Sequence, residues 1–346
     1  METNGVKTKP SCYTQSGVDI DAGDRVKKRI SKSIKQTYTK CVLHKEGAFG
    51  AMFSMSNNSM EKPVLVSSMD GVGTKVKLAV STGKHYGIGC DLVNHSINDI
   101  LTCGAKPLFF LDYFACAKQN DDVVLQLIDG MSTACKAAGM ALIGGETAQM
   151  SDVYAPEEYD LAACIVGVVD EDDIINGSKI TPGNSIIGIP SSGLHTNGYT
   201  LARKVLIEEC GYALDKVAPR LRRTLGEDLL EPHRSYLDEV TKIREITEVR
   251  GIAHITGGGF EGNVSRILPD HCKSKIDTNV WRPQPIFSLI QKSGNIPKEE
   301  MYRVFNMGIG LVIVIKQSDK NLVCNQIEGS ICIGEIVKGS GVELEF

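Results

Sequence analysis

The stretch Asp70-Gly-Val-Gly-Thr-Lys75 follows the apolar run Pro63-Val-Leu-Val66. A glycine-rich turn that leaves a strand can point backbone N–H groups at an anion such as a phosphate. The turn begins with a carboxylate, however, and a carboxylate repels a phosphate. Asp70 is explained if a divalent cation lies between the two groups, because Mg²⁺ is usually held by one or two carboxylates together with phosphate oxygens. A plain Asp-Gly turn without a ligand is the alternative.

Two familiar phosphate-binding motifs do not match this stretch. A P-loop places its lysine before the hydroxyl residue, whereas Thr74 precedes Lys75 here. A dinucleotide-binding fingerprint needs a third glycine, and only Gly71 and Gly73 are present. The turn is therefore a phosphate-binding candidate of another kind.

Length and composition restrict the class of protein. The chain has 346 residues, of which 42% are hydrophobic and 23% charged, which is typical of a globular protein of about two domains. The net charge of -4 and the lack of a basic block make nucleic acid an unlikely partner. No apolar run reaches the roughly 18 residues of a membrane span, and the polar start of the chain, residues 1–9, does not resemble a signal peptide.

The cysteines indicate the cellular compartment. The chain has 11 cysteines, scattered singly and without a Cys-x-x-Cys motif. This pattern argues against both a disulfide scaffold and a zinc site. It predicts free thiols in a reducing, cytoplasmic setting.

Strand and helix patterns alternate along the chain. Strands are expected at 64–69, 108–116, 161–169 and 185–189, with a further strand inside 304–315, and helices at 121–138, 197–210 and 261–268. Asn120 or Asp121 is the expected cap of the first of these helices. The polar, glycine-containing stretch after Val169 is the expected linker. We therefore predict an α/β protein with an N-terminal domain over 1–177 and a C-terminal domain over 178–346.

Three carboxylates flank glycines or amides in the N-terminal half. Asp70 follows one predicted strand, Glu146 follows a strand that ends at Ile143, and Asp99 lies next to Asn98 on a helix that begins near Gly89. Carboxylates brought together repel unless a cation neutralises them. The three therefore predict a metal–phosphate site, although each taken singly is an ordinary surface acid.

Three glycine-rich or polar loops are further candidates. Gly47-Ala-Phe-Gly50 could be a mobile cover, but an ordinary loop is the favoured interpretation. The loop Ser191-Ser-Gly-Leu-His-Thr-Asn-Gly198 gathers hydroxyl, imidazole and amide groups at a predicted helix start, where an anion can bind. His254-Ile-Thr-Gly-Gly-Gly259 predicts a second phosphate cradle, because consecutive glycines suggest a close approach to the backbone. A helix cap and a flexible interdomain turn are the respective alternatives.

In their order and spacing these motifs resemble one family, phosphoribosylformylglycinamidine cyclo-ligase, also called aminoimidazole ribonucleotide synthetase. The resemblance runs from about Tyr13 to the C-terminus. Its motifs are those quoted above together with Gly17-Val-Asp-Ile-Asp-Ala-Gly23, Gly104-Ala-Lys-Pro-Leu-Phe-Phe-Leu-Asp-Tyr113, Gly144-Gly-Glu-Thr-Ala148 and Met301-Tyr-Arg-Val-Phe-Asn306. Each motif is weak alone, and the full ordered set is highly specific.

The resemblance implies a fold and an activity. The family couples ATP hydrolysis to closure of the imidazole ring of formylglycinamidine ribonucleotide. Its fold has two α/β domains, and the N-terminal domains of two subunits pair so that their strands form a β-barrel at the core of a homodimer. ATP and Mg²⁺ lie on that domain near the subunit interface.

The resemblance also implies roles for residues of this chain. Asp70, Asp99 and Glu146 correspond to the metal site. ATP-binding positions are Gly47, Phe49, Gly50, Gly71, Gly73, Thr74, Lys75, Asn98, Gly144, Gly145 and Thr147. Substrate-side positions are Ser192, Thr196, Asn197, Thr256, Gly257, Gly258 and Gly259. His195 is the first candidate for a proton-handling or oxyanion-stabilising residue and His254 the second, with Asp99 as a further catalytic candidate, and the sequence does not decide between the two histidine roles.

This chain departs from the family pattern at several positions. His233 stands where threonine is usual, so it is not assigned a catalytic role, and His95 is kept only as a weak candidate. Related ATP-using proteins, including a selenophosphate synthetase, a thiamine-phosphate kinase and a hydrogenase maturation factor, offer alternative activities. A selenophosphate synthetase would need a reactive cysteine in the loop 47–50, which has none. A catalytically inactive binding subunit would be expected to lack the three carboxylates.

Overall fold

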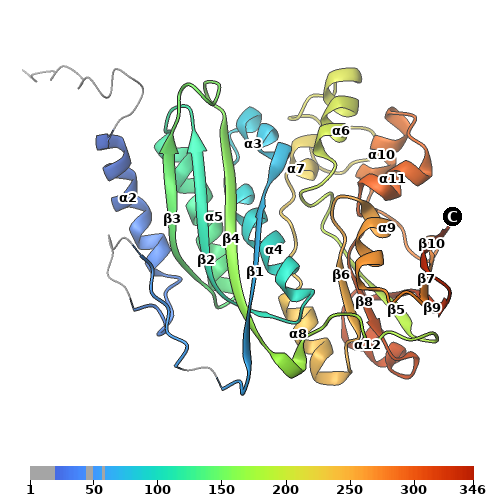
Figure 1. Cartoon of the computed structure of the whole chain (residues 1–346). Helices are drawn as coiled ribbons and strands as arrows, with labels where there is room; N and C mark the ends of the chain where they lie inside the picture. The colour runs from blue at the N-terminus through green and yellow to red at the C-terminus, as the bar shows by residue number, and fades with distance from the viewer. Residues whose placement is uncertain (1–19, 44–49, 57–58) are drawn as a thin grey trace, which may run out of the picture.

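A computed structural model describes residues 20–43, 50–56 and 59–346, with side chains from Arg25 onward. It contains two β-sheets with helices between and around them (Figure 1). The mixed α/β fold predicted from the sequence is confirmed. Gly47 and Phe49 of the predicted nucleotide site lie outside the described residues. In the part of the chain that is described, no helix is long and apolar enough to cross a membrane.

The first sheet has the strand order β1-β4-β2-β3. Strands β1 and β2 both pair antiparallel with β4, whereas β2 and β3 are parallel. The elements of this half are α2 (Ile20–Lys35), β1 (Pro63–Gly71), α3 (Val76–Thr82), α4 (Tyr86–Leu101), β2 (Lys106–Cys116), α5 (Asp121–Ala137), β3 (Ala141–Gln149) and β4 (Tyr159–Asp170). Strand β3 thus lies at the opposite edge of the sheet from β1.

Helices α4 and α5 cover one face of this sheet and pack closely on each other. The Asn120 side chain accepts the backbone N–H of Asp122 at 3.0 Å, which confirms it as the cap of α5. A Cβ added at Gly89 would lie 2.1 Å from the backbone oxygen of Leu127 on α5. Only glycine permits this approach, so the position of α4 is fixed by backbone-to-backbone packing.

Among the described residues, the central part of the other face of the first sheet, called the bare face below, leaves large apolar side chains exposed. Leu65 and Met69 on β1 are 61% and 72% exposed, although both are large and apolar. Across the sheet the Phe109 ring on β2 packs against Phe53, with ring centroids 5.2 Å apart. An exposed apolar surface of this kind usually marks an interaction site.

The second sheet has the strand order β10-β7-β9-β5-β8-β6. Its elements are β5 (Ser185–Pro190), α6 (Tyr199–Arg203) with a π-helical turn (Lys204–Glu209), α7 (Leu225–Leu229), α8 (Leu237–Ile246), β6 (Gly251–His254), α9 (Gly259–Val264), β7 (Cys272–Asp277), α10 (Pro285–Ser293), α11 (Lys298–Val304), β8 (Ile309–Ile315), α12 (Lys320–Gln326), β9 (Ile331–Lys338) and β10 (Gly341–Glu345). Every residue of β8 is buried.

Strand β8 is continuously apolar because both of its faces are covered. Its residues Leu311, Ile313 and Ile315 enter the hydrophobic core that also includes α4 and α8. Val312 and Val314 enter a second core with α6, α10 and α11. One core is therefore shared between the two halves of the chain, and α4 lies at their junction (Figure 1).

The structure corrects several expected boundaries. Glu146 does not follow a strand that ends at Ile143 but lies inside β3, which continues to Gln149. Helix α4 begins at Tyr86 rather than near Gly89. The expected helix 197–210 begins at Tyr199, and 261–268 is a short helix, α9, followed by a 3-10 turn over Ser265–Ile267. The predicted domain boundary after Gly177 falls in the segment between β4 and β5.

Candidate active site

The candidate site is built on one polar stripe of helix α4. Residues Asp91, Asn94, His95, Asn98 and Asp99 recur at intervals of three and four, which places them on one face of the helix. This face meets the loop that joins α7 to α8 and the end of β6. The stripe therefore connects the two halves of the chain.

At the N-terminal end of the stripe Asp91 forms an ion pair with Lys75. The distance from Lys75 Nζ to Asp91 Oδ2 is 2.7 Å, and both side chains are fully buried. Lys75 Nζ also donates to the backbone oxygens of His195 at 3.1 Å and Glu231 at 2.8 Å. These contacts use the donor groups of the ammonium, so Lys75 joins the glycine turn to the second half and is not free for a nucleotide, contrary to the expectation from the sequence.

In the middle of the stripe two amides hold the loop between α7 and α8. Asn94 donates to the His233 backbone oxygen at 2.7 Å. The Asn98 side chain donates to the Arg234 oxygen at 2.8 Å and accepts the Tyr236 N–H at 2.9 Å. Asn98 is fully buried, so in this arrangement its amide orients the loop rather than a nucleotide.

At the C-terminal end the carboxylates Asp70 and Asp99 each contact a histidine. His95 Nε2 lies 2.7 Å from Asp70 Oδ2, and His254 Nδ1 lies 2.9 Å from Asp99 Oδ1. Asp99 also accepts from the Ser68 hydroxyl at 3.1 Å. The side chains of Asp70 and Asp99 are 50% and 26% exposed. In contrast to Asp91, these two carboxylates can be reached by a ligand.

Asp70 does not follow the strand, as expected, but lies inside β1 next to its last residue, and its carboxylate is tolerated there because it has partners. Its Oδ1 accepts the N–H of Gly71 at 2.7 Å, and its Oδ2 faces His95. The hydrogen bond to His95 is the main cause that lowers the pKa of Asp70 below its usual value. Gly73 has a φ of +69° and open space around its Cβ position, and the adjacent Thr74 hydroxyl lies 3.0 Å from that of Thr200.

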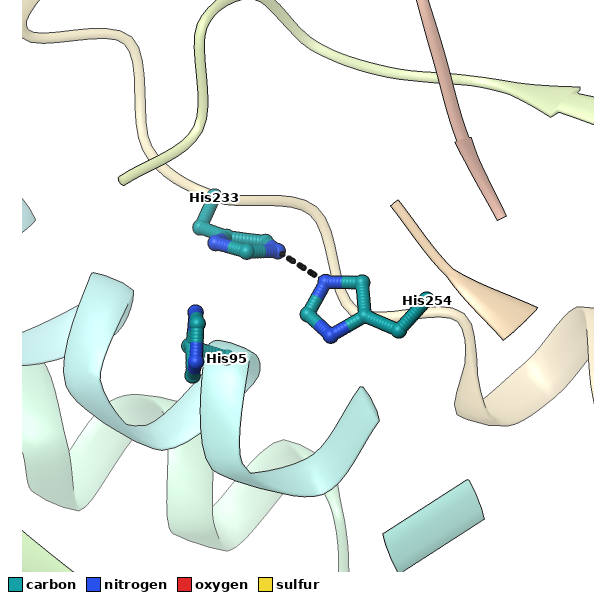
Figure 2. Close-up of side chains that lie close together, drawn as sticks. All are labelled: His95, His233 and His254. Atoms are coloured by element: carbon teal, nitrogen blue, oxygen red, sulfur yellow. Dashed lines mark hydrogen bonds between the residues drawn. The ribbon is translucent and has the colours of Figure 1, made fainter. Parts of the chain in front are cut away.

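Two further imidazoles complete a cluster of four. His233 Nε2 lies 3.1 Å from His254 Nε2 (Figure 2). The His233 ring also stacks on that of His195, with centroids 3.9 Å apart. His233 Nδ1 is 3.4 Å from the Thr196 hydroxyl, which is 2.9 Å from His95 Nδ1. His95, His195, His233 and His254 are all buried.

The pKa values of the four histidines are shifted in different directions. Burial lowers the pKa of His195, His233 and His254, and their mutual repulsion adds to this effect for His195 and His233. Burial alone would also lower the pKa of His95, but the hydrogen bond to Asp70 and the charge of Asp99 outweigh it and raise the pKa above the usual value. Of the four rings, His95 is therefore the one that is protonated most readily.

His195 has a defined tautomer. Its Nε2 accepts the backbone N–H of Ser192 at 3.2 Å, so the proton of the neutral ring is on Nδ1. That Nδ1 is buried and has no partner among the described residues. The backbone of His195 has a φ of +63°, which is unusual for a residue with a side chain. The loop thus holds a neutral imidazole with one uncommitted N–H donor.

The neighbouring loop residues are mostly bound to the protein itself. The Ser192 hydroxyl donates to the Pro232 oxygen at 2.6 Å, and the Asn197 amide lies 3.5 Å from the Thr196 hydroxyl. Beside Ser192 lies a cavity of about 360 Å³, which is lined also by Gly193, Arg222, Arg223 and Gln284. The cavity is large enough for part of a small-molecule substrate.

The predicted cradle at Thr256 to Gly259 has a packing explanation. A Cβ at Gly259 would lie 1.8 Å from the Tyr302 backbone oxygen, so the chain needs glycine there in order to pack against α11. The Thr256 hydroxyl donates to Asn263 Oδ1 at 3.2 Å. Gly258 has a φ of +92°, and Gly257 lies near the Asn197 amide oxygen. At least one of the glycines is therefore explained without a phosphate.

The chain does not bring Glu146 to the other two carboxylates. In the first sheet Asp70 is in register with Ala163, Asp112 and Gly145 in turn. Three strand spacings of ~4.8 Å put Asp70 roughly 14 Å from Gly145. Gly144 and Thr147 lie on the same distant strand, β3, whereas Gly50 lies at an exposed bend. The expected set of three metal ligands is therefore not assembled within one chain.

Sequence reasoning assigned no role to two acidic residues, Asp91 and Asp112, and set His233 aside. Asp91 Oδ1 accepts the backbone N–H of His233 across the junction at 2.6 Å. Asp112 on β2 is held beneath Gly145, and burial raises its pKa to about 7. The interval of three to four on α4 was the available signal for Asp91, whereas His233 lies in a loop without a local pattern.

Comparisons with known proteins identify the family that the chain resembles. The family model "AIR synthase related protein, N-terminal domain" matches residues 55–169, and the corresponding C-terminal domain model matches residues 181–346. A phosphoribosylformylglycinamidine cyclo-ligase of Bacillus thuringiensis subsp. konkukian is 47% identical over 96% of this chain and 97% of its own length. One from Bacillus anthracis is 46% identical over the same shares.

Two solved structures share the fold at low sequence identity. Thiamine-monophosphate kinase from Stenotrophomonas maltophilia is 16% identical and superimposes with a TM-score of 0.66 over 92% of this chain and 95% of its own. The E. coli hydrogenase maturation protein HypE is 16% identical, with a TM-score of 0.65 over 93% of each chain. At this identity the likeness concerns the fold alone.

Proposed function

The chain belongs to the phosphoribosylformylglycinamidine cyclo-ligase family, and we propose that it closes the imidazole ring of formylglycinamidine ribonucleotide to give 5-aminoimidazole ribonucleotide in purine biosynthesis. ATP is converted to ADP and phosphate in the reaction. The observation that carries the proposal is the junction at α4. There Asp99 from one half contacts His254 from the other, and His95, which faces Asp70, contacts Thr196 next to His195.

The chemical problem is the formyl amide of the substrate. Its carbonyl carbon is a poor electrophile, and its oxygen is a poor leaving group. Transfer of the γ-phosphoryl group of ATP to that oxygen gives an iminophosphate. An amidine nitrogen then forms a bond to the same carbon, the bond from carbon to oxygen breaks, and the oxygen leaves as part of inorganic phosphate.

The geometry supports different roles for the histidines. His195 is neutral and has a free Nδ1–H donor, so we assign it to stabilise the negative charge that develops on the amide oxygen. His254 is held on Asp99 through Nδ1. We assign the Asp99–His254 pair to proton transfer during ring closure, for which a ring oriented by a carboxylate is suited. The choice that the sequence left open thus favours His195 as a donor rather than a base.

The nucleotide site is proposed at the turn that follows β1. Gly71, Gly73 and Thr74 lie beside the partly exposed carboxylates of Asp70 and Asp99. These two carboxylates fit Mg²⁺, which prefers oxygen ligands, and one ligand atom of each lies within 4.8 Å of the other. When bound, Mg²⁺ would balance the charge of the transferring phosphoryl group. Gly50 and the neighbouring positions 47 and 49 remain candidates for covering the nucleotide.

A homodimer is proposed through the bare face of the first sheet. Leu65 and Met69 lie on this face, and strand alternation places Glu146 on it as well, since Glu146 is in register with Tyr113, Ala162 and Gly71. Pairing two such faces would form a barrel and bury the apolar surface. It would also put Glu146, Gly144 and Thr147 at the subunit interface, where they could serve a site shared between two chains.

The setting is proposed to be the cytoplasm, with small molecules and a second copy of the chain as partners. The ten cysteines within the described residues are all free thiols, as expected in a reducing compartment. The net charge of -4 offers no basic surface for nucleic acid. No role at a membrane is proposed.

The reaction is tested by labelling the formyl oxygen of the substrate with heavy oxygen. In a single turnover each inorganic phosphate should carry one label, because the bond between carbon and that oxygen is broken. Recovered substrate must be checked for retained label, since exchange with water would mimic a negative result. Unlabelled phosphate from fully labelled substrate would refute the iminophosphate, and a lack of substrate-dependent ATP turnover would refute the activity itself.

The dimer is tested separately by sedimentation. Met69→Asp places a charge on the bare face and should convert a dimer into a folded monomer. Leu322→Asp is a matched control, because Leu322 is also exposed (42%) but lies on α12, away from this face. A wild-type chain that is monomeric at micromolar concentration would overturn the dimer.

A further inference from the structure

Three of the four imidazoles converge from three separate elements. His95 comes from the middle of α4, His233 from the loop before α8, and His254 from the end of β6 (Figure 2). The ring centroids are separated by 5.3 Å (His95 to His233), 5.2 Å (His95 to His254) and 5.1 Å (His233 to His254). The rings thus form a nearly equilateral triangle, and one nitrogen of each lies within 4.8 Å of the others.

This triangle has the dimensions of a tetrahedral metal site. Metal–nitrogen bonds of about 2.0–2.1 Å at tetrahedral angles separate ligand nitrogens by about 3.3 Å and the centroids of their rings by about 5.2 Å. The observed centroid distances agree with that value, and His233 Nε2 and His254 Nε2 are 3.1 Å apart. Little movement of these two rings is needed to bind one cation.

Each ring also has an oxygen on its other nitrogen. His95 Nε2 faces Asp70 at 2.7 Å, His254 Nδ1 faces Asp99 at 2.9 Å, and His233 Nδ1 faces the Thr196 hydroxyl at 3.4 Å. Metal-bound histidines almost always have such an outer partner, which fixes the ring orientation and increases its basicity. The other nitrogens are the candidate ligand atoms: His95 Nδ1, which contacts the Thr196 hydroxyl at 2.9 Å, and the Nε2 atoms of His233 and His254, which lie 3.1 Å apart.

We propose that His95, His233 and His254 form a binding site for a divalent cation of the Zn²⁺ class, distinct from the Mg²⁺ that accompanies the nucleotide. Imidazole suits Zn²⁺, whereas Mg²⁺ prefers oxygen. The cation replaces the hydrogen bond between His233 and His254 and the 2.9 Å contact of His95 Nδ1 with Thr196. Three protein ligands leave a fourth position open for water.

Cobalt is the probe for the test, because Co²⁺ adopts the same geometry and absorbs visible light when it is tetrahedral. The full chain is stripped with a chelator and titrated with Co²⁺ in excess Mg²⁺. Tetrahedral d–d bands should saturate at one Co²⁺ per chain, and Zn²⁺ should remove them. Binding by the chain's free cysteines would instead give an intense near-ultraviolet thiolate band. A thiolate band alone, or no saturable d–d band, would overturn the site.

Variants locate the ligands. His233→Asn and His95→Asn should each weaken Co²⁺ affinity by more than about 100-fold, since loss of an outer partner alone typically costs 10–100-fold. Asp99→Asn should fall within that smaller range. His271→Asn is the control, because His271 is exposed and lies outside the cluster, so its affinity should match the wild type. Equal affinity in folded His233→Asn and His95→Asn would refute the assignment.

A consequence for activity rests on the proposed function. Zn²⁺ bound here engages His254 and should inhibit ring closure reversibly, with chelator restoring activity. Co²⁺ bands without inhibition would support the metal site but show that His254 does not take part in the reaction. Inhibition that persists in His233→Asn would show that Zn²⁺ acts elsewhere, and a failure of the cyclo-ligase activity itself would leave the spectroscopic result unaffected.

Discussion

The two ends of the polar stripe on α4 place a carboxylate in opposite environments. Asp91 is fully buried and paired with Lys75, whereas Asp99, two helical turns later, is 26% exposed and paired with His254. The Asp91–Lys75 pair lies within the first half of the chain, whereas the Asp99–His254 contact joins the two halves. The first lies in a region closed to ligands, and the second lies beside the glycine turn of Asp70.

This difference in exposure indicates that one aspartate of α4 has a structural role and the other a chemical role. A buried carboxylate must be matched by a permanent partner, because an unpaired charge in the interior is strongly unfavourable. A carboxylate at a solvent-accessible edge can exchange partners at lower cost. The Asp91 end should therefore determine stability, and the Asp99 end should determine activity.

The largest effect is expected from Lys75→Met. Removal of the ammonium leaves the Asp91 carboxylate buried without its partner, which typically costs 3–5 kcal/mol. Chemical denaturation should show this loss in the free energy of unfolding. The double variant Lys75→Met/Asp91→Asn should recover much of it, because the asparagine is neutral and can still accept the His233 N–H. An unchanged free energy of unfolding in Lys75→Met would contradict the structural role.

At the other end Asp99→Asn should reduce kcat/KM by about 10²–10⁴-fold, the usual contribution of a proton-transfer group. The asparagine can still bond to Ser68 and His254, so the free energy of unfolding should change little. Steady-state kinetics and denaturation on the same preparation make the comparison. Near-normal turnover would show that Asp99 does not take part in the reaction. A large loss of stability would show that Asp99, like Asp91, has mainly a structural role.

Asn98 lies between Asp91 and Asp99 on α4, and a substitution there tests whether this part of the stripe serves stability or activity. Asn98→Ala leaves the Tyr236 N–H and the Arg234 oxygen without partners, which should cost about 1–3 kcal/mol of stability. The KM for ATP should change little once the variant is folded. A raised KM for ATP with normal stability would instead restore the nucleotide-binding role that the sequence suggested.

Local features of the fold were predictable, and contacts between distant segments were not. The strand before Asp70 and the Asn120 cap depend on neighbouring residues, and both were predicted. The sequence grouped Glu146 with Asp70 in one metal site. The strand order β1-β4-β2-β3 separates the two residues, and this order depends on pairing across the whole sheet, which local sequence patterns do not show. Lys75 was assigned to the nucleotide because of its place in the glycine turn. The sequence of that turn does not show that Lys75 pairs with Asp91 and bonds to the loop at Glu231.

The histidine cluster was the part least accessible to sequence reasoning. His233 was set aside as a departure from the family pattern, yet it contacts both His195 and His254. Its neighbours lie tens of residues away in sequence, and no periodicity joins a loop to a helix and a strand end. The histidines are brought together only when α4 packs against the second half of the chain.

The smallest expected effect is a change in the pH dependence of stability. Burial lowers the pKa of His195, His233 and His254 in the folded state, so below the unfolded value of about 6.5 the unfolded chain binds more protons. Stability should therefore fall as pH drops below 6.5 and continue to fall toward the lowered folded values.

His95 has the opposite sign. Its raised pKa gives stability that is complete below 6.5 and is lost as pH rises through the folded value, so it does not offset the loss in acid. In His233→Asn one titrating ring is absent, and the slope between pH 6.5 and 5.5 should be smaller by up to about 1.4 kcal/mol per pH unit. Urea unfolding across this range measures the slope, with His271→Asn as the parallel control. Equal slopes in wild type and His233→Asn would mean that His233 is not held neutral in the folded cluster.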